Sequence, residues 1–220
     1  MHNAHHPALA HHFDNLDQQQ EASALGMWVF LLTEILFFGA LFLIYTIYRM
    51  WYPEAFAAAS HHLDIPLGTI NTAVLIGSSL TMALAVRAAQ LNSRRAIMIF
   101  IALTMILGGV FLGIKAVEYS HKFHEHLVPG PLFVFDPQFA RPAQIFFSLY
   151  FMMTGLHALH MIIGLGMMTV ITTMAWRGTF DGSYYTPVEV SGLYWHFVDI
   201  VWIFLFPLLY LIGAHYGAGH

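Results

Sequence analysis

Cysteine is absent from this 220-residue sequence. Its absence excludes disulfides, thiolate zinc sites, iron–sulfur clusters, a covalent c-type haem and a Cys-bridged dinuclear copper centre. Charged residues are also scarce, at 9% of the chain, whereas a soluble domain carries about 25%. With 8 Lys and Arg and a net charge of −4, the sequence has no basic footprint for nucleic acid. The potential cofactor ligands that remain are 15 His, 12 Asp and Glu, and 12 Met.

Apolar residues make up 58% of the chain, and the mean hydropathy is +0.65. Several continuous apolar runs are long enough to cross a hydrocarbon layer of about 30 Å, which takes about 20 helical residues. These runs cover approximately residues 24–48, 68–90, 95–119, 143–176 and 188–214. They lack the period-two alternation of barrel strands, so helices are favoured. The sequence therefore predicts an all-α fold, an integral membrane bundle of five transmembrane helices, as a single domain over 24–216.

The first 23 residues form a polar, His-rich N-terminal segment that precedes this domain. They contain no Lys or Arg and no long apolar run, so they are not a signal peptide. We expect a mostly flexible tail, in which the histidines are either simply solvated or scavenge metal ions weakly.

Basic residues gather at the ends of the apolar runs. Arg87, Arg94 and Arg95 lie in one short connection, which favours a cytoplasmic N-terminus although the basic residues on the two sides are equal in number. The candidates for contact with lipid headgroups are Arg49, Arg87, Arg94, Arg95 and Arg141.

Ionisable residues within the apolar runs are the candidate functional residues, because such residues are costly in hydrocarbon and usually face a partner. They are Glu34, Lys115, Glu118, His157, His160, His196 and Asp199. Residues three apart share a helix face, which makes Lys115 and Glu118 candidates to pair. The same spacing joins His157 to His160 and His196 to Asp199. We expect His196 and Asp199 to bond to neighbouring helices, with Glu118, His157 or His160 as partners.

Three kinds of role remain open for these residues on spacing alone. They are structural bonding between helices, proton handling or headgroup binding, and metal or haem ligation. A di-iron site is disfavoured because no Glu-x-x-His pair lies within a membrane run. A b-type haem needs only two histidines on facing helices, which His157 and His196 could supply.

Several segments together resemble subunit III of haem–copper terminal oxidases. The last apolar run contains the segment YWHFVDIVW at 194–202, which is similar to the last helix of that subunit. The preceding run has the family's Gly-x-His-x-x-His pattern at Gly155, His157 and His160. Further resemblance lies in residues 27–38, 71–79 and 114–122. Because order and spacing agree over residues 25–214, the chain is identified as a member of this family in its five-helix bacterial form.

The resemblance implies an accessory subunit that binds no redox cofactor itself. Its expected partners are the oxidase's catalytic subunit I, which holds the haems and copper, subunit II and phospholipids. Glu34 would be the family's buried carboxylate, near the interface with subunit I. The complex would reduce oxygen and pump protons in the bacterial inner membrane, with this chain supporting proton uptake and turnover.

Cytochrome c oxidase is the main interpretation, and a quinol oxidase is the first alternative. A nitric oxide reductase–associated relative also belongs to the family, and a freestanding haem b protein is the alternative from another class. The sequence lacks the two N-terminal helices of the family's long form, which help to form its lipid cleft.

Overall fold

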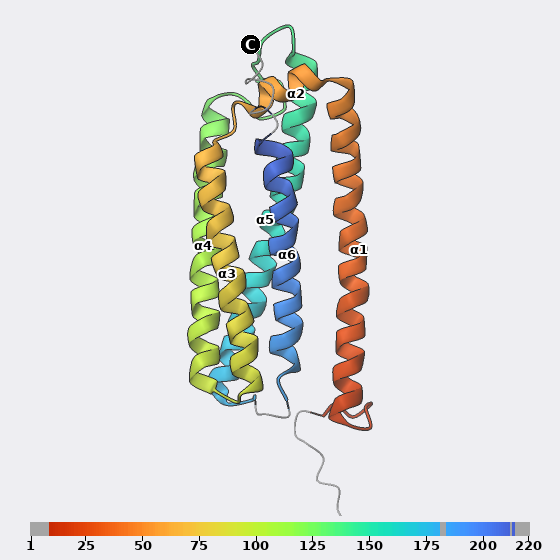
Figure 1. Ribbon diagram of the computed structural model, residues 1–220, viewed down its shortest axis with the longest axis vertical. Coiled ribbons are helices and arrows are strands. Elements are labelled where there is room, and N and C mark those ends of the chain that lie inside the picture. The colour runs from red at the N-terminus through yellow and green to blue at the C-terminus, as the bar shows by residue number, and fades with distance from the viewer. Residues whose placement is uncertain (1–8, 181–183, 212, 214–220) are drawn as a thin grey trace, which may run out of the picture.

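The computed structural model describes residues 9–180, 184–211 and 213. The helices in these ranges are α1 (Leu16–Trp51), α2 (Pro53–Ser60), α3 (Ile65–Gln90), α4 (Arg94–His124), α5 (Ala140–Arg177) and α6 (Thr186–Tyr210). All but α2 are long and apolar enough to cross a membrane (Figure 1). The predicted all-α bundle of five transmembrane helices is therefore confirmed.

Helix α2 lies between the first two predicted membrane-spanning runs, 24–48 and 68–90, where no helix was predicted. Pro53 occupies the first turn, where its missing N–H costs nothing, and alanines make up half of the helix. Phe56 is fully buried, with its ring centroid 5.4 Å from those of both Tyr45 and Phe146. The short helix thus closes one end of the bundle by packing on α1 and α5.

Side-chain caps explain two helix starts that hydropathy places too late. The Asn15 side chain accepts a 2.8 Å hydrogen bond from the Gln18 amide, so α1 begins at Leu16 rather than near Ala24. The Asp64 side chain likewise accepts from the Leu67 amide at 3.0 Å and opens α3. The first turns of α1 are tied to α6, because the side-chain amide of Gln20 donates a 3.0 Å hydrogen bond to the Glu189 carboxylate.

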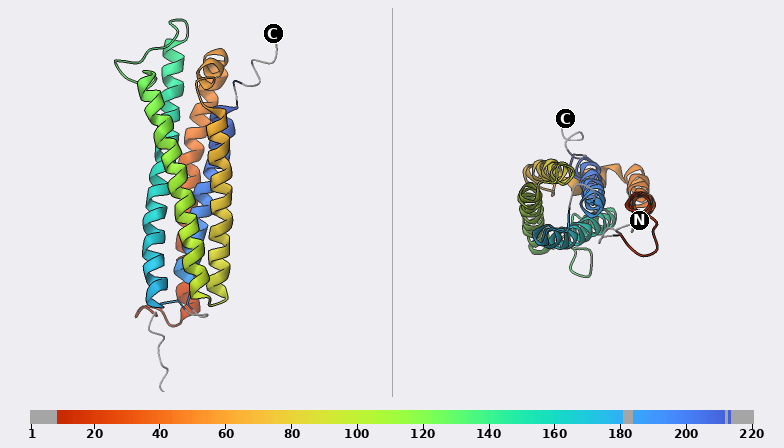
Figure 2. Two further views of the ribbon diagram at one scale, coloured as in Figure 1. Left: turned by 90° about the vertical axis from the view of Figure 1, so that its left-hand side faces the viewer. Right: turned by 90° about the horizontal axis from the view of Figure 1, so that it is seen from below.

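Helices α3, α4, α5 and α6 surround a common axis, and α1 lies outside this ring beside α6 (Figures 1 and 2). Each ring helix packs on its two neighbours, and α1 contacts α6, α5 and α2. Many α1 side chains remain exposed, including Trp28, Leu36 and Leu43. A large apolar surface therefore faces lipid or another membrane protein.

Trp195 on α6 lies at the centre of the ring and is fully buried. Its indole N–H donates to the Ser78 hydroxyl on α3 at 2.9 Å. The other edge of the Trp195 indole lies against Gly108 on α4 and Gly164 on α5. The contact is so close that a Cβ on either glycine would come within 2.9 Å of the indole. One side chain thus fixes the spacing of all the ring helices.

Candidate functional site

A buried ion pair joins α4, α5 and α6 near the α2 end of the bundle. The Lys115 ammonium donates to Glu118 at 2.9 Å, to the Tyr150 hydroxyl at 3.1 Å and to the Tyr210 hydroxyl at 2.9 Å. Both tyrosine hydroxyls donate onward to the other carboxylate oxygen of Glu118. The predicted pairing of Lys115 with Glu118 is confirmed.

Every polar atom of this centre finds its partner inside the chain. Lys115 and Glu118 are 3% and 2% exposed. Four aromatic rings also lie 5.1 to 5.6 Å from the ammonium group, from Tyr119, Tyr150, Trp202 and Tyr210. Removing either Lys115 or Glu118 alone would lower the free energy of unfolding, because the other charge would be left buried and unpaired. The arrangement therefore serves as a polar clamp between three helices.

Glu34 on α1 pairs with His160 on α5. A Glu34 carboxylate oxygen lies 3.3 Å from His160 Nε2, and the two side chains are 19% and 12% exposed. The second ring nitrogen, Nδ1, bonds to the Leu156 carbonyl oxygen at 2.8 Å. The imidazole also packs edge-on against Phe38 of α1 and stacks near Tyr194 of α6. Together with the hydrogen bond from Gln20 to Glu189, this cluster supplies polar contacts that hold α1 to the ring.

His157 and His160 contact different helices although they are three residues apart. His157 is 1% exposed and lies between Phe111 of α4 and Trp202 of α6, with ring centroids 5.4 and 5.1 Å away. Neither of its nitrogens has a hydrogen-bond partner among the described residues. His160 instead faces α1. The shared spacing therefore does not make them one site.

His196 and Asp199 face α3. The expectation that His196 bonds to a neighbouring helix is confirmed, but Glu118, His157 and His160 are wrong as its partners. His196 Nδ1 lies 2.7 Å from the Ser79 hydroxyl. Asp199 is 3% exposed, and within the described residues neither of its oxygens has a hydrogen-bond partner. Both side chains line a cavity of about 400 Å³ between α3 and α6. His157 instead packs between Phe111 and Trp202, whereas His196 bonds to Ser79. The two histidines suggested for a haem are therefore not brought together.

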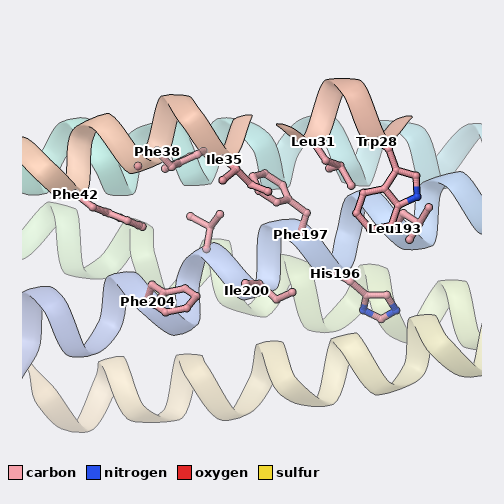
Figure 3. Close-up of a pocket in the computed structure, with 12 residues that line it drawn as sticks. Trp28, Leu31, Ile35, Phe38, Phe42, Leu193, His196, Phe197, Ile200 and Phe204 are labelled. Carbon is pink, nitrogen blue, oxygen red and sulfur yellow. The ribbon is translucent and has the colours of Figure 1, made fainter. Parts of the chain in front are cut away.

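An apolar groove of about 400 Å³ runs between α1 and α6 (Figure 3). Aromatic and branched side chains form both of its walls, among them Trp28, Phe42 and Phe204. His196 stands at its edge, with its ring on the α3 side of α6 (Figure 3). The groove can take a hydrocarbon chain but offers few groups for a polar ligand.

The candidate headgroup arginines lie at the two ends of the bundle. Arg87 ends α3 and donates to Gln90 at 3.1 Å, while Arg94 and Arg95 begin α4 beside it. Arg49 is in the last turn of α1 and Arg141 in the first turn of α5, at the opposite end. All but the half-buried Arg49 are exposed. The five candidates therefore form two groups, one near each end.

Sequence reasoning missed the hydroxyl groups that complete these sites. Tyr150, Tyr210 and Ser79 each bond to an ionisable residue far away along the chain. Tyrosine and serine are common in membrane helices, so their presence alone gave no signal. A search for hydroxyl residues on the faces opposite each buried charge is the one hint that the sequence offered.

The fold and its internally satisfied polar clamp define a polytopic membrane protein whose external surface is largely apolar. Residues 10–214 match the family model of cytochrome c oxidase subunit III. The chain therefore belongs to this family of haem–copper oxidase subunits.

Named relatives include subunits of both cytochrome c and quinol oxidases. The chain is 28% identical to subunit 3 of the cytochrome bo(3) ubiquinol oxidase of Pseudomonas aeruginosa, over 94% of this chain and 92% of the relative. It is 32% identical to cytochrome c oxidase subunit 3 of Thermostichus vulcanus, over 90% and 92%. It is 30% identical to a probable quinol oxidase subunit 3 of Staphylococcus haemolyticus, over 92% and 95%. The relatives are subunits of oxidase complexes with either kind of electron donor.

Proposed function

We propose that this chain is an accessory, non-redox subunit of a bacterial cytochrome c oxidase. It packs against catalytic subunit I, which holds the haems and copper, and subunit II completes the complex. The observation that supports this proposal most strongly is the match to cytochrome c oxidase subunit III over nearly the whole chain. Ionisable side chains within the helices make contacts at separate places, Glu34 with His160, Lys115 with Glu118 and His196 with Ser79. This distribution supports a role in assembly rather than electron transfer.

Glu34 and His160 are the residues through which this subunit supports proton uptake. Their contact joins α1, the helix outside the ring, to α5, and both side chains keep some exposure. A carboxylate and an imidazole in contact can exchange a proton, since imidazole changes charge near neutral pH. The competing interpretation is that the pair only anchors α1.

Phospholipid is the proposed ligand of the groove between α1 and α6. Its walls are apolar along their length, as an acyl chain requires. Exposed Arg87, Arg94 and Arg95 are placed to contact headgroups at one end of the bundle, and Arg141 with Arg49 at the other. We assign the Arg87–Arg95 end to the cytoplasm because three arginines gather in that short connection. The start of α1 lies at the same end of the bundle, so this orientation puts the N-terminal side of α1 on the cytoplasmic face of the bacterial inner membrane.

An affinity tag on this chain tests the proposal. The chain should co-purify with haem- and copper-containing subunits, and the complex should oxidise reduced cytochrome c with consumption of oxygen. Oxidation of a quinol but not of cytochrome c would instead assign the chain to a quinol oxidase, which the relatives of that name favour. Recovery of the chain alone with a bis-His haem spectrum would overturn both assignments.

Two substitutions separate a proton role from an anchoring role at α1. Glu34→Gln keeps size and hydrogen bonding but cannot exchange a proton. If proton uptake depends on Glu34, this variant should shorten the turnover lifetime while haem content stays normal. If it behaves as wild type and Glu34→Ala loses the subunit, only the anchoring role stands.

A further inference from the structure

Four arginines gather at one corner of the bundle, where α3 ends, α4 begins and α5 ends (Figure 1). All four are exposed, and they make up half of the 8 Lys and Arg in the sequence: Arg87, Arg94, Arg95 and Arg177. Arg94 reaches across to α5, since a Cβ on Gly178 would lie 3.6 Å from the Nη1 atom of Arg94. The guanidinium groups of three helices therefore share one surface, which we call the arginine corner.

The charge of the arginine corner is not balanced by any carboxylate in the described part of the chain. Arg87 donates to the Gln90 side chain, and the ion pairs among the described residues involve lysine and histidine but no arginine. Described carboxylates at this end of the bundle lie on α1 and α6 instead, at Asp17, Glu21 and Glu189. Helix α1 stands on the opposite side of the bundle from α4 (Figures 1 and 2). This end therefore has a basic edge and an acidic edge.

Exposed apolar side chains stand beside the arginines. Leu91 directly follows α3, and Trp176 lies in the last turn of α5; they are 63% and 69% exposed. Tryptophan near the end of a spanning helix is typical of the membrane–water interface. A soluble anion would leave both side chains in water, whereas a phospholipid covers them with its glycerol and acyl region while its phosphate meets the arginines. The corner therefore fits an anionic amphiphile better than a soluble anion.

We propose that the arginine corner binds an anionic phospholipid in preference to a zwitterionic one. Guanidinium groups bind phosphate oxygens through two parallel hydrogen bonds, and clusters of four or more basic residues beside a spanning helix are typical of anionic-lipid sites. A zwitterionic headgroup carries its own cation, which the four arginines repel. The inference deepens the headgroup contact proposed above and rests on it for the membrane setting. It adds Arg177 to the site and specifies the charge of the lipid.

Photolabelling of the purified oxidase complex in phosphatidylcholine vesicles tests this preference. The probes are phosphatidylglycerol and phosphatidylcholine, each with a diazirine at the same position close to the glycerol. Mass spectrometry then locates the label in peptides that contain residues 87–95 or 176–179. We expect saturable labelling of these peptides by the phosphatidylglycerol probe. Unlabelled phosphatidylglycerol should compete about tenfold better than phosphatidylcholine, since each arginine near the membrane surface contributes about fivefold in affinity for an anionic lipid.

Soluble phosphates separate a lipid from a free anion as the occupant. Inorganic phosphate and glycerol 3-phosphate, added at constant ionic strength, should not displace the phosphatidylglycerol probe, because neither covers Leu91 and Trp176. Displacement by either compound would overturn the lipid as the ligand. Added salt should weaken the preference for phosphatidylglycerol, since charges exposed to water are screened beyond about 8 Å at physiological ionic strength. A preference that salt leaves unchanged would contradict the role of the arginines.

Variants then assign the preference to the arginine corner. Arg94→Gln and Arg177→Gln should each lower the preference for phosphatidylglycerol about fivefold, and replacing all four arginines by glutamine should abolish it. Arg141→Gln is the matched control, because it removes an exposed arginine at the opposite end of the bundle and should leave labelling of the corner unchanged. If the variant without all four arginines fails to assemble, the lipid competition and its salt dependence in the wild-type complex still decide.

Equal competition by the two lipids would overturn the inference, as would an undiminished preference in the assembled variant without the four arginines. Leu91→Cys, which introduces the single cysteine of this cysteine-free chain, tests whether protein covers the corner. Disulfide cross-linking of this variant to another oxidase subunit would equally refute the site. Any of these results with co-purification and oxygen consumption intact leaves the proposed function standing. If the chain instead failed to co-purify with haem-containing subunits, the proposed function would fail, and the same probes would test the full chain by itself.

Discussion

Gly164→Ala tests whether Gly164 is required for the close contact with Trp195 or is present only because glycine is common in membrane helices. An added Cβ would lie 2.8 and 2.9 Å from two atoms of the Trp195 ring and 3.2 Å from the Tyr194 ring. Trp195 cannot withdraw easily, since its N–H is bonded to Ser78 and its far edge meets Gly108. Overpacking of this kind costs about 1–3 kcal/mol.

Gly166 supplies the control on the same helix, because a Cβ there meets nothing within 4 Å. Alanine is favoured over glycine in a helix interior by up to about 1 kcal/mol, a gain that both variants share. The difference in the free energy of unfolding between Gly164→Ala and Gly166→Ala therefore isolates the clash with Trp195. Unfolding of the purified subunit by SDS in mixed micelles, followed by circular dichroism, measures it.

A second pair on α4 repeats the comparison with Gly108 and Gly109, of which only Gly108 lies against Trp195. In the double variant Gly108→Ala/Gly164→Ala, the two changes in the free energy of unfolding should not add, because both new methyl groups press on the Trp195 indole. Equal stabilities for Gly164→Ala and Gly166→Ala would refute the reasoning that Trp195 sets the helix spacing.

Three further predictions concern the buried polar groups and the α2 end of the bundle. Tyr210→Phe removes a hydroxyl that bonds both Lys115 and Glu118 and should lower the free energy of unfolding by about 1–3 kcal/mol. Tyr45→Phe, whose hydroxyl has no partner in the described chain, should cost much less in the same titration. Lys115→Met alone should cost about 3–5 kcal/mol, and adding Glu118→Leu should restore part of this loss, whereas a larger loss in the double variant would contradict the clamp. Partial desolvation, with Lys122 nearby, lowers the pKa of the surface residue His62 below its usual 6.5 despite the opposing Glu125. When this end of the bundle unfolds, His62 binds a proton more readily than in the folded state. The contribution of His62 to stability is therefore present above about pH 6.5 and is lost as the pH falls. His62→Phe, which keeps the ring contact with Phe135, should flatten the acid-side loss of hydrogen-exchange protection in residues 125–139.

The spanning helices could be predicted because hydropathy reports directly on the membrane. The helix ends could not, since they depend on single caps. Asn15 starts α1 in a polar stretch that carries no apolar signal. Helix α2 could not be predicted either, because it is short and its burial depends on contacts of Phe56 with side chains of α1 and α5.

Pairs within one helix were also predictable, as Lys115 and Glu118 show. Contacts between helices were not, because they depend on rotation about each helix axis. Residues three apart differ in direction by about 60°, and in the ring this separates His157 among Phe111 and Trp202 from His160 beside α1. The same uncertainty hid the bond between His196 and Ser79.

The polar groups of this chain divide the molecule into a closed ring and an attached helix. The ring holds its own buried charges, at Lys115 and Glu118, and is wedged by Trp195. Helix α1 is held by aromatic packing, by the pair of Glu34 with His160 and by the bond of Gln20 to Glu189. These contacts leave its outer face and the groove beside α6 open. A change at Glu34 therefore acts on the attached helix rather than on the closed ring, so its effects should reach lipid binding and proton uptake before they reach folding of the ring.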